Sequence, residues 1–382
     1  MAKVNLIIFS PHSNWGGGEQ SLACFLNHLR RHYSADYTCR LVLAEPGVLE
    51  EHLHQLKIPS QLFPFPYMVG HFRPVQFSGF FHIRRLMRII REFSASPTIF
   101  YFNGFYKCEL MIILMRCLFP RIPILVHHRT VLASYPLHCR LALALSTAQL
   151  CISDFVKSHL PFPYRHPSRS IRLHNMIDFD RIDQIVSSGT HPPFSNVPCH
   201  IAIHSRISPE KGQGDFIRIA HQVSRLADPT RFKFHIYGAP LYGSDDYLMT
   251  LRSMIRKEGL DTLVILEGFK AGILDEIVRM DAVLVLSDHE PLGRVVMESM
   301  ALGRIVMAYG WGGPIELIRH GETGYLIRPR DIEQAAQLIV HLSGNPSEAQ
   351  RVAMQAFRCS RSMFDHPAYF DRFRTVVQSI LG

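Results

Sequence analysis

The sequence predicts an α/β protein made of two Rossmann-like halves. Short apolar runs bounded by turn residues alternate with helical patterns from the N-terminus to about residue 180, which is typical of a doubly wound parallel sheet. Residues 187–198, SSGTHPPFSNVP, are rich in Ser and Pro and have the composition of a linker. After this segment the same alternation begins again.

Chain length also favours two domains, because 382 residues exceed the roughly 250–300 at which a single hydrophobic core stops growing. We expect one domain at residues 1–188 and a second at residues 199–360. The carboxyl ends of both sets of strands are expected to face a central cleft, since doubly wound sheets bind ligands at that edge. Residues 361–382 are expected to form a C-terminal helix that crosses back to the first domain and packs across both.

Apolar runs and helical periodicity give the expected elements of each half. In the first half, strands are expected at residues 4–9, 38–44, 98–102, 122–126 and 150–152. Its helices are expected at residues 20–32, 49–56, 81–93, 109–118 and 141–148, and a last one, capped by Ser153-Asp154, ends at residue 160. In the second half, strands are expected at residues 201–203, 232–237, 264–266, 282–286, 305–308 and 324–327. Its helices are expected at residues 216–224, 247–258, 273–280, 315–320 and 332–342, with one more that carries Glu298.

Composition excludes a disordered chain, since 47% of residues are hydrophobic and 19% are charged. A net charge of +9 favours anionic partners such as nucleotides, nucleic acid or acidic lipid. The eight cysteines show no CxxC or zinc-type spacing, which indicates a reducing compartment. The start, MAKVNLIIFS, is too short for a signal-peptide core, and no run approaches the ~20 apolar residues that span a bilayer. We expect a cytoplasmic protein.

One segment leaves peripheral membrane association open. Residues 81–93, FHIRRLMRIIREF, place apolar residues at helical spacing and arginines on the other side. They follow an aromatic and proline-rich loop at residues 59–75. Such a helix can lie on an anionic membrane, or it can pack its apolar side into the core and leave the arginines in water.

Two loops could present groups to an anion. In the first half, a strand runs into NWGGGEQ at residues 14–20 and then into a helix, an order that directs backbone N–H groups towards a phosphate. This motif is not GxGxxG, and a glycine turn without a ligand explains it as well. In the second half, Arg206 and Lys211 share a loop that follows a strand. A guanidinium fork and a compact ammonium group suit phosphate oxygens, although such residues are also common surface charges. Asp245-Asp246 follows a turn and is interpreted as a helix cap.

The loop after the strand at residues 282–286 changes this interpretation. It ends in Glu290-Pro-Leu-Gly293 and leads into a helix that carries Glu298. Gly293 allows close approach to the backbone, and the first N–H groups of a helix favour negative charge. Ionised carboxylates accept hydrogen bonds, so Glu290 and Glu298 suit hydroxyl-rich ligands. Hydroxyl groups beside phosphates describe a nucleotide sugar.

Four segments together resemble glycosyltransferase family 4: NWGGGEQSL, HSRISPEKGQ, EPLGRVVMESMALGRIVMA and GGPIELIRHGETGYLI. Members of that family are retaining nucleotide-sugar transferases with two Rossmann-like domains, the GT-B fold. The resemblance implies that the first domain binds the acceptor and the second the donor. It implies transfer from a nucleotide-diphosphate sugar to a cell-envelope, lipid-linked or polysaccharide acceptor, without a metal or other cofactor and without a nucleic-acid partner. An anionic membrane surface stays a candidate partner.

The resemblance also implies roles for individual residues. Arg206 and Lys211 would bind the diphosphate as it leaves, and Glu290 would hold hydroxyls of the transferred sugar. One histidine, either His127 or His128, would contact the donor sugar. The implied donor-binding residues are Gly17, Gly18, Gly238, Gly268, Leu292, Gly293, Arg294, Val295 and Glu298, with Glu298 on the ribose hydroxyls.

Some features leave specificity open. Gly238 is followed by Ala-Pro where many relatives have a second glycine, and His289 stands before Glu290, so neither the nucleotide nor the sugar is assigned. Asn103, Tyr106, Arg129 and Tyr135 lie on expected loops of the first half, but no spacing there names an acceptor. A two-Rossmann nucleotide-sugar epimerase and a non-catalytic nucleotide-sugar-binding protein are the alternative functions.

Overall fold

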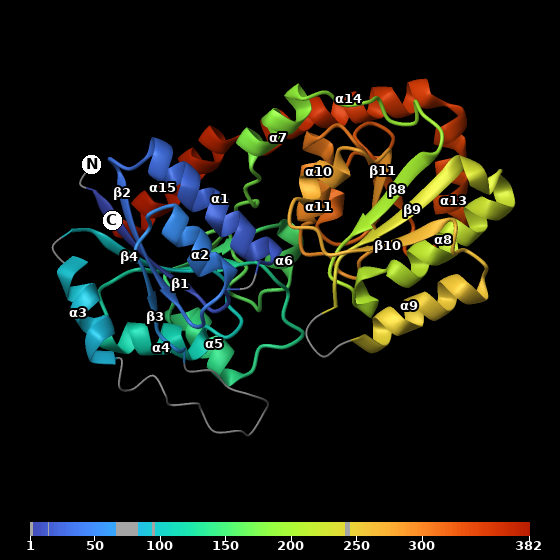
Figure 1. Cartoon of the computed structure of the whole chain (residues 1–382). Coiled ribbons are helices and arrows are strands. Elements are labelled where there is room, and N and C mark those ends of the chain that lie inside the picture. The colour runs from blue at the N-terminus through green and yellow to red at the C-terminus, as the bar shows by residue number, and fades with distance from the viewer. Residues whose placement is uncertain (1–2, 14, 66–82, 94–95, 241–244) are drawn as a thin grey trace. The chain divides into compact units, whose positions relative to one another are not determined.

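The chain folds into two compact units, each of which is a parallel sheet with helices on both faces (Figure 1). The structure is a computed structural model that describes residues 3–13, 15–65, 83–93, 96–240 and 245–382. The first unit contains Met1–Met176 and His366–Gly382, and the second contains Ile177–Asp365. The predicted α/β class with two Rossmann-like sheets is confirmed. Residues 187–198, the expected linker, lie within the second unit.

The first unit has a seven-stranded sheet in the order β3-β2-β1-β4-β5-β6-β7. Its strands are β1 (Val4–Ser10), β2 (Tyr37–Leu43), β3 (Ser60–Leu62), β4 (Thr98–Phe102), β5 (Ile124–His128), β6 (Ala148–Cys151) and β7 (Ser170–Arg172). Its helices are α1 (Gly17–His32), α2 (Val48–Gln55), α3 (Ile83–Phe93), α4 (Glu109–Leu118), α5 (Leu137–Leu145), α6 (Asp154–Ser158) and α15 (His366–Leu381). The predicted cap at Ser153 is confirmed, because its side chain accepts a hydrogen bond from the N–H of Val156.

Strand β1 shows why this sheet is covered on both faces. Leu6 and Ile8 pack into a cluster with α1, α2 and α15, whereas Ile7 and Phe9 pack into a second cluster with α3, α4 and α5. A strand buried on both sides reads as a continuous apolar run, as expected for a parallel sheet.

The C-terminal helix belongs to the core of the first unit. Phe370 and Phe373 of α15 are buried, and they pack with Phe25 of α1 at ring-centroid distances of 5.4 and 5.2 Å. The first unit is therefore completed by the last residues of the chain.

The second unit has a six-stranded sheet in the order β10-β9-β8-β11-β12-β13. Its strands are β8 (Cys199–His204), β9 (Phe232–Tyr237), β10 (Val264–Gly268), β11 (Ala282–Val285), β12 (Ile305–Tyr309) and β13 (Tyr325–Ile327). Its helices are α7 (Phe179–Ser187), α8 (Gln213–Leu226), α9 (Asp245–Lys257), α10 (Ile273–Ile277), α11 (Arg294–Ala301), α12 (Pro314–Leu317), α13 (Ile332–Gly344) and α14 (Pro346–Met363).

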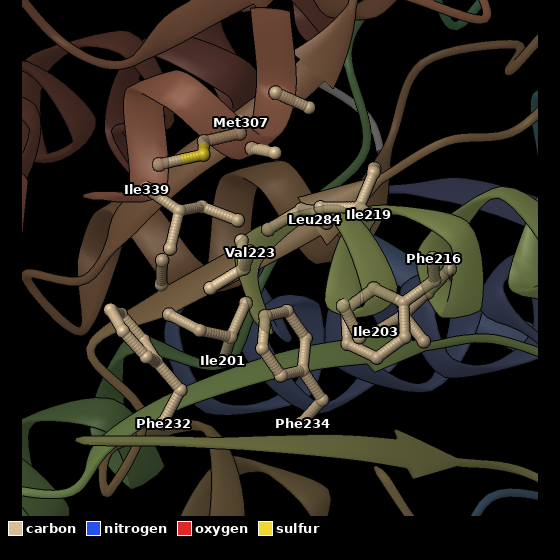
Figure 2. Packing of buried hydrophobic residues seen from close by; sticks show 14 of the residues in the cluster. Ile201, Ile203, Phe216, Ile219, Val223, Phe232, Phe234, Leu284, Met307 and Ile339 are labelled. Carbon is tan, nitrogen blue, oxygen red and sulfur yellow. The ribbon is translucent and has the colours of Figure 1, made fainter. Parts of the chain in front are cut away.

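Helices α8, α9 and α13 lie on one side of this sheet, and α10 and α11 lie on the other (Figure 1). Figure 2 shows the core on the first side, where Phe216 and Val223 of α8 meet Ile201 of β8 and Phe234 of β9. Ile339 of α13 closes this core. Asp245 and Asp246, interpreted as a cap, form the first turn of α9.

Some predicted boundaries were wrong. Strand β5 extends through His128 rather than ending at residue 126, and the helix expected at residues 141–148 is α5, which ends at Leu145. Strands β3 and β7 and helices α7 and α14 were not predicted. Two three-residue strands are too short to show a period in the sequence.

The arginine-rich helix is α3. Its Leu86 and Ile90 are fully buried in the core of the first unit, while Arg84 and Arg88 are exposed. The apolar side of this helix therefore packs into the core, which is one of the two alternatives that the sequence left open. Residues 66–75 of the neighbouring aromatic loop lie outside the described residues, as does Asn14 of the glycine motif. None of the described helices is both long and apolar enough to cross a membrane.

Candidate active site

The second sheet has a topological switch point between β8 and β11. All six strands are parallel. From β8, the strands β9 and β10 are added in sequence order towards one edge of the sheet, and β11, β12 and β13 are added towards the opposite edge. The loop after β8 carries Arg206 and Lys211, and the loop after β11 carries Glu290. In doubly wound sheets the crevice for a ligand lies outside the carboxyl ends of the strands at this point.

An ion pair joins these two loops. The Nζ atom of Lys211 donates to Oε2 of Glu290 at 2.8 Å, although the two residues are 79 positions apart in sequence. Their side chains are 23% and 17% exposed. Because both charges are mostly removed from water, each needs the other as a partner.

Backbone packing between three loops holds this pair in place. A Cβ atom at Gly212, which has φ +78°, would lie 2.3 Å from the carbonyl oxygen of Leu286. The N–H of Asp288 donates to the carbonyl of Glu210 at 2.8 Å, and the N–H of Gly313 donates to the carbonyl of Glu290 at 2.8 Å. These close approaches require glycine at positions 212 and 313.

Arg206 lies on the same loop as Lys211 and is less buried. Its Nη2 atom donates to Oε1 of Glu210 at 2.6 Å, and the Ser208 hydroxyl donates to the same oxygen at 2.7 Å. Burial works against ionisation of Glu210, but the hydrogen bonds from Ser208 and Arg206 outweigh it and lower the pKa of this carboxyl. Gln213 anchors the loop by donating to the carbonyl of Arg206 at 2.8 Å. The guanidinium is thus preorganised at the edge of the sheet.

Glu298 is the more deeply buried carboxylate. Its Oε1 atom accepts from Nε of Arg294 at 2.6 Å, and its side chain is only 5% exposed. The two residues lie one turn apart on α11, which begins after Gly293 at φ +95°. Two predicted donor-binding residues are therefore bonded to each other. Leu292 before them is buried, and Val295 is half-buried.

Gly238 and Gly268, both predicted to bind the donor, lie together. The N–H of Gly238 donates to the carbonyl of Gly268 at 2.9 Å, where β9 and β10 end. A Cβ atom at Gly238 would lie 1.9 Å from the carbonyl oxygen of Ser205. This glycine therefore packs directly against the residue before Arg206.

The predicted residues of the first unit fall into two groups. Gly17 begins helix α1 and Gly18 follows it. A Cβ atom at Gly18 would lie 3.2 Å from Cδ of Arg129, the residue that follows β5. The glycine motif therefore lies beside an arginine to which the sequence assigned no role.

His127 and His128 are both buried in β5. Nδ1 of His127 is 2.6 Å from the Tyr101 hydroxyl, and Nε2 of His128 is 2.7 Å from Oε1 of Gln149. Burial lowers the pKa of His128 to about 4, and burial with the nearby charge of Arg129 lowers that of His127 well below its usual value. Both rings are held inside the first unit, so their contact with a donor sugar stays a prediction.

Within the described ranges, no three His, Cys, Asp or Glu side chains are grouped so that they could hold a metal ion.

A comparison with protein families identifies the second unit. Residues 198–358 match the family model described as glycosyl transferases group 1. The match covers the second unit and not the whole chain, so it is the second unit that is similar to glycosyl transferases group 1. The matched residues include every predicted site residue of the second unit, from Arg206 to Glu298. This is the family 4 assignment that the motifs predicted.

Curated relatives of this glycosyltransferase domain match it only in part. One is an exopolysaccharide phosphotransferase of Streptomyces coelicolor, 35% identical over 107 residues, which are 28% of this chain and 11% of the relative. Another is the N-acetyl-α-D-glucosaminyl L-malate synthase of Bacillus anthracis, 23% identical over 141 residues, which are 37% of each protein. The chain therefore spans well under two thirds of the length of these relatives.

A solved structure matches the whole chain in fold. The crystal structure of Anabaena HepE in complex with UDP has a TM-score of 0.78 at 21% identity, over 98% of this chain and 100% of that one. The fold is GT-B, as predicted.

The glycine contacts predict a local stability effect. In Gly313→Ala the new Cβ would lie 2.2 Å from Cα of Leu292, so the loop of Glu290 must move. We expect a loss of about 1–3 kcal/mol, as for other overpacked sites. Gly344→Ala is the matched control, because nothing lies within 4 Å of its added Cβ. Urea unfolding measures both, and equal stability of the two variants would contradict the packing described.

The buried His128 predicts a pH effect on stability. Its pKa is about 4 in the folded protein against 6.5 for an ordinary histidine, so the unfolded state binds the proton more tightly. Its contribution to stability is complete above about pH 6.5 and is lost as the pH falls towards 4. At about 1.4 kcal/mol per pKa unit, the loss approaches 3 kcal/mol.

Unfolding free energies from pH 7 to 4, measured for the wild type and His128→Gln, test this effect. The variant should lose stability less steeply, because its side chain at position 128 does not titrate. Parallel pH profiles for the two proteins would show that His128 is not held neutral by burial.

Proposed function

We propose that the protein is a retaining glycosyltransferase that moves a sugar from a nucleotide-diphosphate sugar to an acceptor. The observation that carries this proposal is the Lys211–Glu290 ion pair at the switch point of the second sheet. It brings a cation suited to phosphate and a carboxylate suited to hydroxyls within one hydrogen bond of each other. Both residues lie in the segment that matches glycosyl transferases group 1.

In this proposal the donor replaces contacts that the protein makes with itself. Arg206 would bind the diphosphate instead of Glu210, and Lys211 would bind it instead of Glu290. Glu290 would then be free to accept hydrogen bonds from hydroxyls of the transferred sugar. Glu298, held by Arg294 on α11, would accept from the ribose hydroxyls, and the edge formed by Gly238 and Gly268 would receive the base.

The same cations would accelerate the chemistry. When the bond between the anomeric carbon and the diphosphate breaks, the electron pair stays on the phosphate oxygen. Fixed cations and the N-terminal N–H groups of a helix stabilise that growing charge most, because they need no reorganisation as it forms. The acceptor hydroxyl would form the new bond on the same face of the sugar, and its proton would pass to the departing phosphate oxygen.

The choice of substrates rests on relatives. Structures of Anabaena HepE hold UDP and UDP-glucose, so UDP sugars are the first donors to test. We propose a cell-envelope, lipid-linked or polysaccharide acceptor, bound by the first unit in the cytoplasm, and no metal requirement. The exposed Arg84 and Arg88 of α3 would face an anionic membrane if the protein associates with one.

Two substitutions test the proposal. Lys211→Ala and Glu298→Ala should each lower the rate of sugar transfer about 100- to 1,000-fold, the loss seen when a fixed group that stabilises transition-state charge is removed. Lys257→Ala, on the exposed side of α9, should transfer at the wild-type rate. Radiolabelled donor measures transfer, and a cooperative melting transition above the assay temperature shows that each variant is folded, because loss of one partner of a buried ion pair lowers the melting temperature by itself.

The same assay separates the other functions. An epimerase would convert nucleotide sugar without an acceptor and would form no glycoside. A binding protein would raise its melting temperature with nucleotide sugar but consume none. Wild-type transfer by both Lys211→Ala and Glu298→Ala would refute the site assignment.

A further inference from the structure

The first sheet also has a topological switch point. The proposed function assigns no binding residue to it. Its strand order reverses between β1 and β4, and the loops after β1, β4 and β5 meet at this edge. Ser10 ends β1, Asn103 follows β4 and Arg129 follows β5. By the rule that located the site in the second unit, this edge should also bind a ligand.

Arg129 is held there by two asparagines. Its Nε atom donates to Oδ1 of Asn103 at 2.7 Å, and its Nη1 atom donates to Oδ1 of Asn175 at 2.6 Å. Both asparagines are buried. The amide of Asn103 is itself fixed, because Nδ2 donates to the Ser10 hydroxyl at 3.4 Å. The guanidinium therefore has one defined orientation.

The asparagines hold Arg129 without neutralising it. An amide oxygen accepts a hydrogen bond but carries no net charge. Among the described residues, no carboxylate forms an ion pair with Arg129. Glu19 is the nearby carboxyl: burial raises its pKa more than the charge of Arg129 lowers it, and the two side chains form no described hydrogen bond or ion pair.

This arrangement is unfavourable for a purely structural arginine. A partly buried charge is best stabilised by an opposite charge, and aspartate has the size and shape of asparagine. Aspartate at position 103 or 175 would therefore stabilise the guanidinium better in the empty protein. The neutral partners leave the positive charge to attract a ligand.

We propose that Arg129, oriented by Asn103 and Asn175, binds a phosphate group at the carboxyl edge of the first sheet. A guanidinium presents parallel N–H groups to two oxygens of one phosphate. Gly18 at the start of α1 leaves room for the side chain, since a Cβ there would lie 3.2 Å from Cδ of Arg129. The phosphate belongs either to the donor diphosphate or to a phosphorylated acceptor. The inference itself does not depend on sugar transfer.

Asn103→Asp and Asn175→Asp test this site with almost no change in shape. Each new carboxylate should pair with Arg129 and weaken phosphate binding at least 10-fold, while the melting temperature stays the same or rises. Asn196→Asp, an exposed residue of the second unit, adds the same charge elsewhere and should bind as the wild type does. Calorimetric titration of the full chain with inorganic phosphate measures affinity, in a Lys211→Ala background that weakens the proposed site of the second unit.

A second arm identifies the source of the phosphate, using chains that keep Lys211. If the Asp variants also weaken UDP binding, the site takes the donor diphosphate. If UDP binding is unchanged and inorganic phosphate still binds in saturating UDP, the site takes a phosphate of the acceptor. Phosphate affinity equal to that of the Asn196→Asp control in both Asn103→Asp and Asn175→Asp would overturn the proposal. Whether Lys211→Ala loses sugar transfer tests the proposed function, and its outcome does not change the test of phosphate binding at Arg129.

Discussion

The ion pair between Lys211 and Glu290 is the contact on which the second unit's site depends. It joins the loops after two strands that are neighbours only because the strand order reverses between them. The loops can meet because Gly212 and Gly313 bring backbone against backbone with no room for a Cβ atom. Sheet topology sets where the residues are, glycine packing sets their separation, and charge decides what they can bind.

The two units differ in the partners that they give to a cation at the edge of the sheet. In the second unit Arg206 and Lys211 are paired with carboxylates, so a ligand must displace a charge already bound. Such a site is stable when empty, and it exchanges one anion for another. In the first unit the described hydrogen bonds of Arg129 go to two asparagine oxygens and to the Tyr101 hydroxyl, none of which carries a net charge, so a ligand need not displace a paired carboxylate. Pairing of the cations with carboxylates, as in the second unit, favours release of a product anion. The neutral partners of Arg129 in the first unit favour binding of a phosphate.

Much of the second unit could be predicted from the sequence. Its strands are apolar runs with clear ends, and charged or glycine residues follow them directly, so the motif at Glu290 and the loop at Arg206 were placed correctly on the sheet. The pairing of Lys211 with Glu290 and of Arg294 with Glu298 was not foreseen, because a sequence shows which charges exist but not which of them meet.

The first unit was harder to predict for two physical reasons. His127 and His128 look like loop residues because histidine is polar, yet both lie inside a strand, where Tyr101 is the partner of one nitrogen of His127 and Gln149 that of one nitrogen of His128. The partners of Arg129 are also far away in sequence, with Asn175 46 residues further along the chain. In the sequence, the feature that indicates a site here is that Asn103 and Arg129 each follow an apolar run and therefore lie at the end of a strand. Short elements such as β3 and β7 depend on pairing with neighbours and leave no period of their own.

The measurement that tests the central claim most directly is a thermal-shift comparison of nucleoside diphosphates with their nucleosides. If Arg206 and Lys211 hold a diphosphate, at least one nucleoside diphosphate should raise the melting temperature and its nucleoside should not. At a ligand concentration 100 times its Kd, the gain is about 2.7 kcal/mol, which such an experiment resolves easily. An equal shift for nucleoside and diphosphate, or no shift for any of them, would contradict the account.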